Sequence, residues 1–92
     1  MKIVVRSESL SPQNSALLKE IAQGISQRGL ADVEEEKKYA DNTKGELVTG
    51  IIIGVITNAV YDGIKAIIKA TLENAKARNQ APDITIEEKN DE

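Results

Sequence analysis

The stretch GELVTGIIIGVITNAVYDGIKAIIK, residues 45–69, decides the fold expected for this sequence. Its first part, residues 47–61, contains no charged residue, whereas its second part mixes apolar and charged residues in an amphipathic pattern. Apolar residues that recur at helical spacing indicate a helix. We therefore expect one long helix that begins near Gly45 or Glu46 and runs to about Arg78.

At about 100° per residue, this expected helix carries apolar residues on two sides. The side expected to pack on a sheet contains Ile53, Ile56, Val60, Ile64, Ile67 and Ile68. Away from that side lie Val48, Ile51, Ile52 and Val55. Contiguous exposed apolar patches mark interaction sites, so these four residues form a predicted contact surface for another protein or a second copy of the chain. An alternative stays open, in which the first helix and the 31–45 linker cover the whole surface.

The segments on either side of this stretch supply the other elements. Residues 2–7 contain a β-branched apolar run that is typical of a central strand. A helix follows, with Ser11 as its N-cap, Pro12 at its first position and Gly29 as its C-cap. The alternation of residues 83–87 predicts a final strand with one buried face.

Residues 31–40 leave their structure open, because the charged run between Val33 and Tyr39 has no apolar face. An exposed edge strand tolerates such charges, so a strand and a loop are both compatible with this segment. The glycines of Gly50–Gly54 have the spacing of a close helix–helix contact. Packing of that pair within the chain and packing between chains are both open.

The order of elements is therefore β-α-(β)-α-β, which predicts an α+β two-layer sandwich. Two helices are expected on one face of a small, mainly parallel sheet. The predicted core between helix and sheet contains Ile3, Val5, Leu18, Ile21, Ile56, Val60, Ile64 and Ile67. We expect residues 1–87 to form a single domain and residues 88–92 to form an acidic, frayed tail.

Composition excludes several kinds of chemistry. The chain has no His and no Cys, so the common zinc sites and His-based catalytic triads are excluded. The run Glu34-Glu35-Glu36 is interpreted as a solvated charge run, because consecutive strand residues point to opposite faces. We therefore predict no catalytic, cofactor-binding or metal-binding residues, and a protein that is not an enzyme.

Charge and hydropathy also limit the partners. The net charge of −3 argues against nucleic-acid binding, which needs clustered Lys and Arg. A membrane span needs about 20 apolar residues, more than residues 47–61 supply, so membrane binding is not expected. The N-terminal apolar run is too short for a signal peptide. A cytoplasmic protein, able to form a homo-oligomer, is the expectation.

A short opening strand, a first helix, a polar linker, a Gly-led apolar helix from Gly45 to Lys69 and a closing Thr-Ile strand make up the chain. This layout resembles the small effector-associated constant component of bacterial conflict systems. That family typically has a Trp- and Arg-rich end to its second helix, where this chain has Ile67-Ile68-Lys69. The resemblance implies an adaptor or sensor in bacterial antiviral defence that binds an effector, and it implies no catalytic residue.

The function expected from the sequence is a small non-enzymatic protein-interaction or adaptor module. Two other classes stay open. One is a phage- or plasmid-encoded inhibitor of a host enzyme, in which acidic charge imitates nucleic acid. The other is a membrane-active protein that inserts the second helix.

Overall fold

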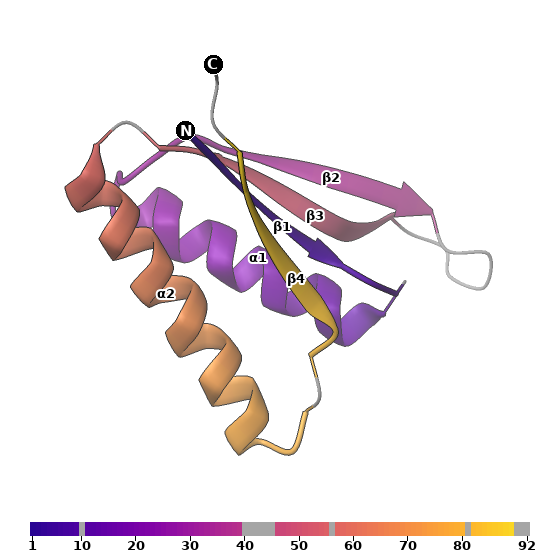
Figure 1. The fold of residues 1–92 in the computed structure, drawn as a ribbon. Coiled ribbons are helices and arrows are strands. Elements are labelled where there is room, and N and C mark those ends of the chain that lie inside the picture. Colours follow the sequence, from indigo (N-terminus) through magenta and orange to yellow (C-terminus); the bar gives the residue numbers. More distant parts are fainter. Residues whose placement is uncertain (10, 40–45, 56, 81, 90–92) are drawn as a thin grey trace.

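Strands and helices follow one another in a regular order in a computed structural model of the chain (Figure 1). The structure describes residues 1–9, 11–39, 46–55, 57–80 and 82–89. Along these residues the elements are β1 (Lys2–Ser7), α1 (Pro12–Gln27), β2 (Val33–Tyr39), β3 (Glu46–Gly54), α2 (Asn58–Ala77) and β4 (Ile84–Lys89). The α+β class predicted from the sequence is therefore confirmed.

The sheet has the strand order β2-β3-β1-β4, and every neighbouring pair is antiparallel. The expectation of a mainly parallel sheet is wrong. Both β1 and β2 run opposite to β3, so the strands joined by α1 do run in the same direction, but β3 lies between them. In the same way β3 and β4, the strands joined by α2, run in the same direction, but β1 lies between them. This arrangement is the ferredoxin-like, split βαβ topology.

The sheet was predicted wrongly because residues 46–54 form the strand β3 and not the first half of a helix. This strand is paired on both edges, by β1 and by β2. A strand enclosed in this way has a continuous apolar run, which periodicity alone does not distinguish from a buried helix. Its composition favours a strand, since Val48, Thr49 and the three consecutive isoleucines are β-branched.

Helix α2 begins only at Asn58, after the N-cap Thr57, whose hydroxyl accepts the N–H of Val60 at 3.2 Å. The predicted caps of the first helix are confirmed. The hydroxyl of Ser11 accepts the N–H of Asn14, and Gly29 takes the left-handed conformation with φ of 63°. The N–H of Leu30 then donates to a carbonyl in the last turn, which closes the helix.

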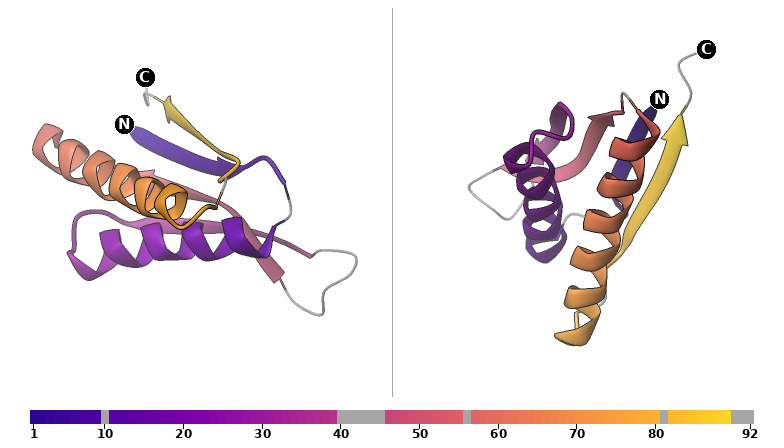
Figure 2. Two further views of the ribbon diagram at one scale, coloured as in Figure 1. Left: turned by 90° about the horizontal axis from the view of Figure 1, so that it is seen from below. Right: turned by 90° about the vertical axis from the view of Figure 1, so that its left-hand side faces the viewer.

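Both helices cover one face of the sheet, with α1 over the β2–β3 side and α2 over the β1–β4 side (Figures 1 and 2). The buried core between these layers includes Ile3, Val5, Leu18, Ile21, Ile25, Ile51, Ile53, Ile64 and Ile68. The predicted core positions Ile3, Val5, Leu18, Ile21 and Ile64 are thus confirmed. Val60 and Ile67 are only half-buried, and Ile56 lies outside the described residues.

The two outer strands bear on the remaining predictions, which concern residues 31–40 and the expected tail of residues 88–92. Residues 33–39 form the strand β2 at one edge of the sheet. At the other edge, β4 extends two residues beyond residue 87, so Glu88 and Lys89 belong to a strand and not to a frayed tail. Residues 90–92 of the expected tail lie outside the described residues.

Candidate interaction surface

The contact surface predicted from the sequence does not exist as a helix face. Val48, Ile51 and Val55 are 2%, 0% and 9% exposed and belong to the hydrophobic core. Ile52 alone points to the other face of the sheet, where it is half-buried beside Val4. The prediction is corrected on this point, because the side chains of a strand alternate between two faces and do not spread around an axis.

A bulge explains why Val48 and Ile51, three positions apart, share the inner face. The pairing of β2 with β3 shifts between Glu36 and Lys37, so that Thr49 is passed over. The N–H of Val48 donates to the hydroxyl of buried Ser15 on α1 at 2.9 Å. The bulge therefore turns Val48 toward α1 and supports the core at the end of the sheet.

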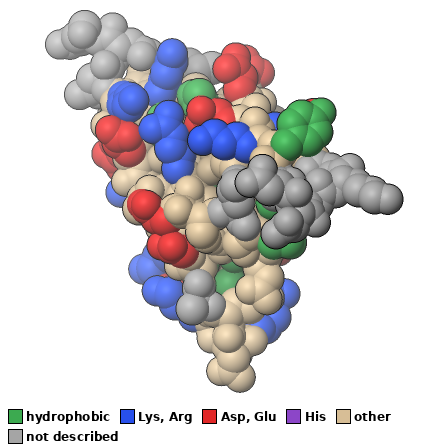
Figure 3. Space-filling view, turned by 90° about the vertical axis from the view of Figure 1, so that its right-hand side faces the viewer, with side chains coloured by type: hydrophobic (Ala, Val, Ile, Leu, Met, Phe, Trp, Pro, Cys, Tyr) green, Lys and Arg blue, Asp and Glu red, His purple; other side chains and the backbone are tan. Residues whose placement is uncertain are grey.

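The sheet face that carries no helix mixes charges of both signs. Figure 3 looks toward this face and shows Lys, Arg, Asp and Glu side chains interleaved, with small apolar areas between them. Arg6 of β1 and Glu36 of β2 meet at 3.2 Å across the intervening Gly50 of β3. A Cβ at Gly50 would lie 2.9 Å from the Glu36 carboxylate, so the missing side chain makes room for this ion pair. The face resembles a solvated surface rather than a site.

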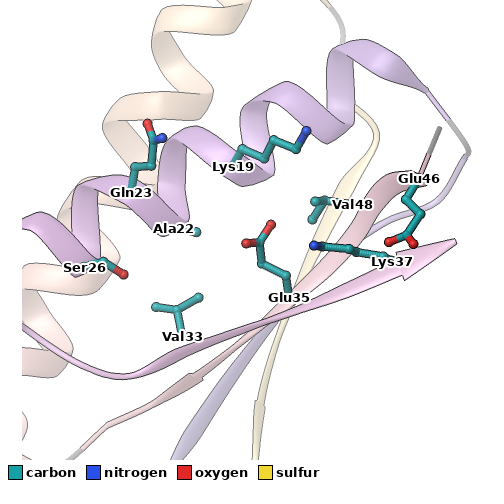
Figure 4. A pocket seen from close by; sticks show the side chains of 9 residues that line it. All are labelled: Lys19, Ala22, Gln23, Ser26, Val33, Glu35, Lys37, Glu46 and Val48. Carbon is teal, nitrogen blue, oxygen red and sulfur yellow. The ribbon is translucent and has the colours of Figure 1, made fainter.

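A hollow of about 340 Å³ lies between α1 and β2 (Figure 4). Its charged side chains balance one another, since Lys19 and Lys37 face Glu35 and Glu46, and all four are exposed. In the described part of the chain, no buried side-chain nitrogen or oxygen lacks a hydrogen-bond partner. Nor do these residues contain a group of three or more possible metal ligands. The hollow therefore offers no buried polar group that would fix a ligand.

A second depression, of about 280 Å³, lies between α2 and β4, and its base is apolar. We call it the α2–β4 groove; it is lined by Lys65, Ile68, Lys69, Leu72, Glu73, Lys76 and Ile86. Ile86 faces the helices, as its partner Val5 does, yet 46% of its surface is exposed. A large apolar side chain that faces inward and remains this exposed indicates that α2 leaves the edge of the sheet uncovered.

A polar cluster at the end of β4 ties this strand to α2. The hydroxyl of Tyr61 donates to the carboxylate of Glu88, and the Lys65 ammonium lies 3.4 Å from the same carboxylate. The ammonium also lies 5.1 Å from the centroid of the Tyr61 ring. The Tyr61 hydrogen bond, and then Lys65, lower the pKa of Glu88. Hydrogen bonds to Tyr61 and Glu88 raise the pKa of Lys65. The cluster links α2 to β4 at this end of the groove.

The edge of β4 next to the groove is unpaired. β4 pairs with β1 on one side, and among the described residues no strand pairs with its other side. The sequence predicted this strand and one buried face, but alternation reveals which face points inward and not how far a helix covers it. An exposed apolar side chain beside unpaired backbone groups is the arrangement on which an added strand can build.

Comparisons with known proteins do not identify the chain. No protein-family model matches it, and no curated protein matches it either. The described residues contain no helix that is long and apolar enough to cross a membrane. Within the uncharged stretch of residues 47–61, on which the membrane-active alternative depended, residues 47–54 belong to the strand β3 and residues 58–61 to the first turn of α2.

Proposed function

We propose that this chain is a non-enzymatic protein-interaction module that binds its partner through the α2–β4 groove and the neighbouring edge of β4. The observation that carries the proposal is the 46% exposure of Ile86 at the base of an apolar groove. Burial of apolar side chains supplies affinity, and backbone hydrogen bonds to a strand edge supply orientation. The ferredoxin-like topology does not by itself indicate a function.

The groove suits an extended polypeptide better than a small polar molecule. Ile68, Leu72 and Ile86 form its apolar base, whereas its charged residues stand at the rim. A polypeptide strand placed beside β4 would add to the sheet and lay alternate side chains into this base. The groove contains no group positioned to activate a substrate, so binding is the activity that its chemistry favours.

The partner class expected from the sequence is an effector of a bacterial conflict system. This part of the proposal depends on the family resemblance alone. In that role the module would hold an effector in an assembly, and the effector would supply the chemistry.

The test places a photoreactive amino acid, benzoylphenylalanine, at position 86 in the full chain, in the cells that naturally make it. The control places the same residue at Glu34, an exposed position on the opposite face of the sheet. We expect a cross-linked polypeptide, identified by mass spectrometry, from position 86 and not from position 34. The purified partner should then bind the wild-type chain and bind Ile86→Lys at least about tenfold more weakly. Equal cross-linking from both positions would contradict the proposal.

A further inference from the structure

We propose that the α2–β4 groove is occupied by a second copy of the chain, which pairs with the first through antiparallel β4 strands related by a two-fold axis at Ile86. This inference depends on the proposed function, because it names the partner of the same surface. The two-fold axis makes the contact isologous, so that each copy provides both the groove and the strand that fills it.

The backbone of β4 shows which groups are available for pairing. The N–H of Glu8 donates to the carbonyl of Asp83 at 2.8 Å, so Asp83 directs its backbone toward β1. Successive strand residues direct their N–H and C=O groups to opposite edges. The backbone groups of Ile84, Ile86 and Glu88 therefore point to the unpaired edge. The side chains of these same residues face the helices, as their β1 partners Val5 and Ile3 do.

Pairing across a two-fold axis at Ile86 satisfies all of these groups. Ile86 lies opposite Ile86 of the second copy, and Ile84 lies opposite Glu88. Each of these pairs exchanges N–H and C=O hydrogen bonds in the manner of an antiparallel ladder. The two Ile86 side chains then meet above the axis, between the Leu72 and Ile68 side chains of both copies, and cover the apolar base of each groove.

The charges of β4 select this register. With Ile86 on the axis, Asp83 lies opposite Lys89 of the second copy, and Thr85 lies opposite Glu87. A shift of two residues in one direction places Glu87 opposite Glu87, and in the other direction it places Asp83 opposite Glu87. Like charges directly opposite one another destabilise a strand pair. A shift of one residue would place inward-facing side chains opposite outward-facing ones. Of the registers within two residues of this one, the register centred on Ile86 pairs inward-facing side chains with one another and keeps like charges apart.

The other edge of the sheet has charged residues in the middle of its strand, and its exposed apolar residue, Tyr39, lies at the end of β2. Five of the seven residues of β2, Glu34 to Lys38, are charged. Its carboxylate Glu36 is already paired with Arg6. Charged side chains protect an edge strand against pairing with another sheet. The structure therefore favours β4 and not β2 as the edge that a second copy uses.

Light scattering coupled to size-exclusion chromatography tests the oligomeric state of the full chain. We expect the wild type to be a dimer. Ile86→Lys should be a monomer, because a dimer of this variant would bury unpaired charges at the axis. The dissociation constant should rise by more than about a hundredfold. The control is Glu35→Lys, an exposed position on the helix-facing side of the opposite edge strand, which should remain dimeric. Circular dichroism checks that both variants are folded.

A charge exchange tests the register. Asp83→Lys alone and Lys89→Asp alone each place like charges opposite one another and should weaken the dimer, whereas the two substitutions together should restore it. Because the chain contains no cysteine, Ile86→Cys introduces a unique thiol at the axis. Opposite residues in a hydrogen-bonded antiparallel pair are close enough for a disulfide. Mild oxidation should therefore give a covalent dimer of Ile86→Cys and not of Glu35→Cys.

The results of these experiments distinguish a failure of this inference from a failure of the proposed function. A wild-type monomer at high concentration, or a dimer that Ile86→Lys leaves intact, would overturn the inference. If that monomer still cross-links another protein from position 86, the proposed function holds and only the identity of the partner is wrong. If position 86 cross-links nothing, both proposals fail.

Discussion

At the scale of single residues, exposure separates the side chains that hold the fold from those that are available for binding. Ile64 of α2 is completely buried against the sheet, whereas Ile67, one turn away, is half-buried. Ile86 is as apolar as either residue, but 46% of its surface is exposed. The same residue type therefore has a structural role at position 64 and, in our proposal, a binding role at position 86.

Replacement of Ile64 by Ala should lower the free energy of unfolding by about 2–5 kcal/mol, because it removes buried methyl groups and leaves a cavity. This is a large share of the stability of a domain of this size. Ile67→Ala is the control and should cost clearly less. Urea denaturation of both variants measures the difference. Equal losses, or a loss below about 1 kcal/mol for Ile64→Ala, would show that the face of α2 has been assigned wrongly.

The cluster of Tyr61, Lys65 and Glu88 makes a prediction about pH. Because the pKa of Glu88 is lowered from its ordinary value of 4.5, chiefly by the Tyr61 hydroxyl, the folded state favours the ionised carboxylate. The contact therefore stabilises the fold above the pKa of the unfolded chain, and this contribution is lost as pH falls through the lower folded-state value. Tyr61→Phe should raise the pKa of Glu88 in an NMR titration, and Lys65→Met should raise it less. A larger effect of Lys65→Met would reverse the assigned order of causes.

At the scale of elements, the central question is whether residues 46–54 form a strand. The glycines of this segment discriminate between the two interpretations. In a helix, replacing either glycine by Ala would stabilise the element by about 1 kcal/mol. In β3, a Cβ at Gly50 would meet the Glu36 carboxylate at 2.9 Å, whereas a Cβ at Gly54 would meet nothing within 4 Å.

Gly50→Ala should therefore be less stable than Gly54→Ala, since the Arg6–Glu36 pair must move to accommodate the new methyl group. Gly54→Ala should be neutral or slightly stabilising, because Ala restricts the unfolded chain. Thermal unfolding of both variants checks the order. Equal stabilisation by both substitutions would support a helix and contradict the strand.

Local signals predicted several elements correctly. Ser11, Pro12 and Gly29 marked the first helix, and the alternation after Asp83 marked the last strand. Helix α2 was predicted with the wrong start, because the apolar residues of β3 continue directly into it. The start signal was present in Thr57-Asn58, and the β-branched residues and glycines before it favoured a strand. Once that strand was missed, the antiparallel topology could not be predicted.

At the scale of the whole molecule, the candidate site depends on the relative placement of a helix and a strand. The exposure of Ile86 is set by the position of α2 over the sheet, which depends on contacts between elements that lie far apart in the sequence. The sequence thus predicted an apolar contact surface, but three of its four residues, Val48, Ile51 and Val55, belong to the core.

Amide hydrogen exchange along β4 tests most directly whether a second copy of the chain pairs with this edge. In a dilute sample the amides of Thr85, Glu87 and Lys89, which face β1, should be protected, while those of Ile84, Ile86 and Glu88 should exchange rapidly. In a concentrated sample the second set should become protected as well, and Ile86→Lys should abolish that gain. Rapid exchange of Ile84, Ile86 and Glu88 at every concentration, or a concentration-dependent gain confined to β2, would contradict the pairing of β4 with a second copy of the chain.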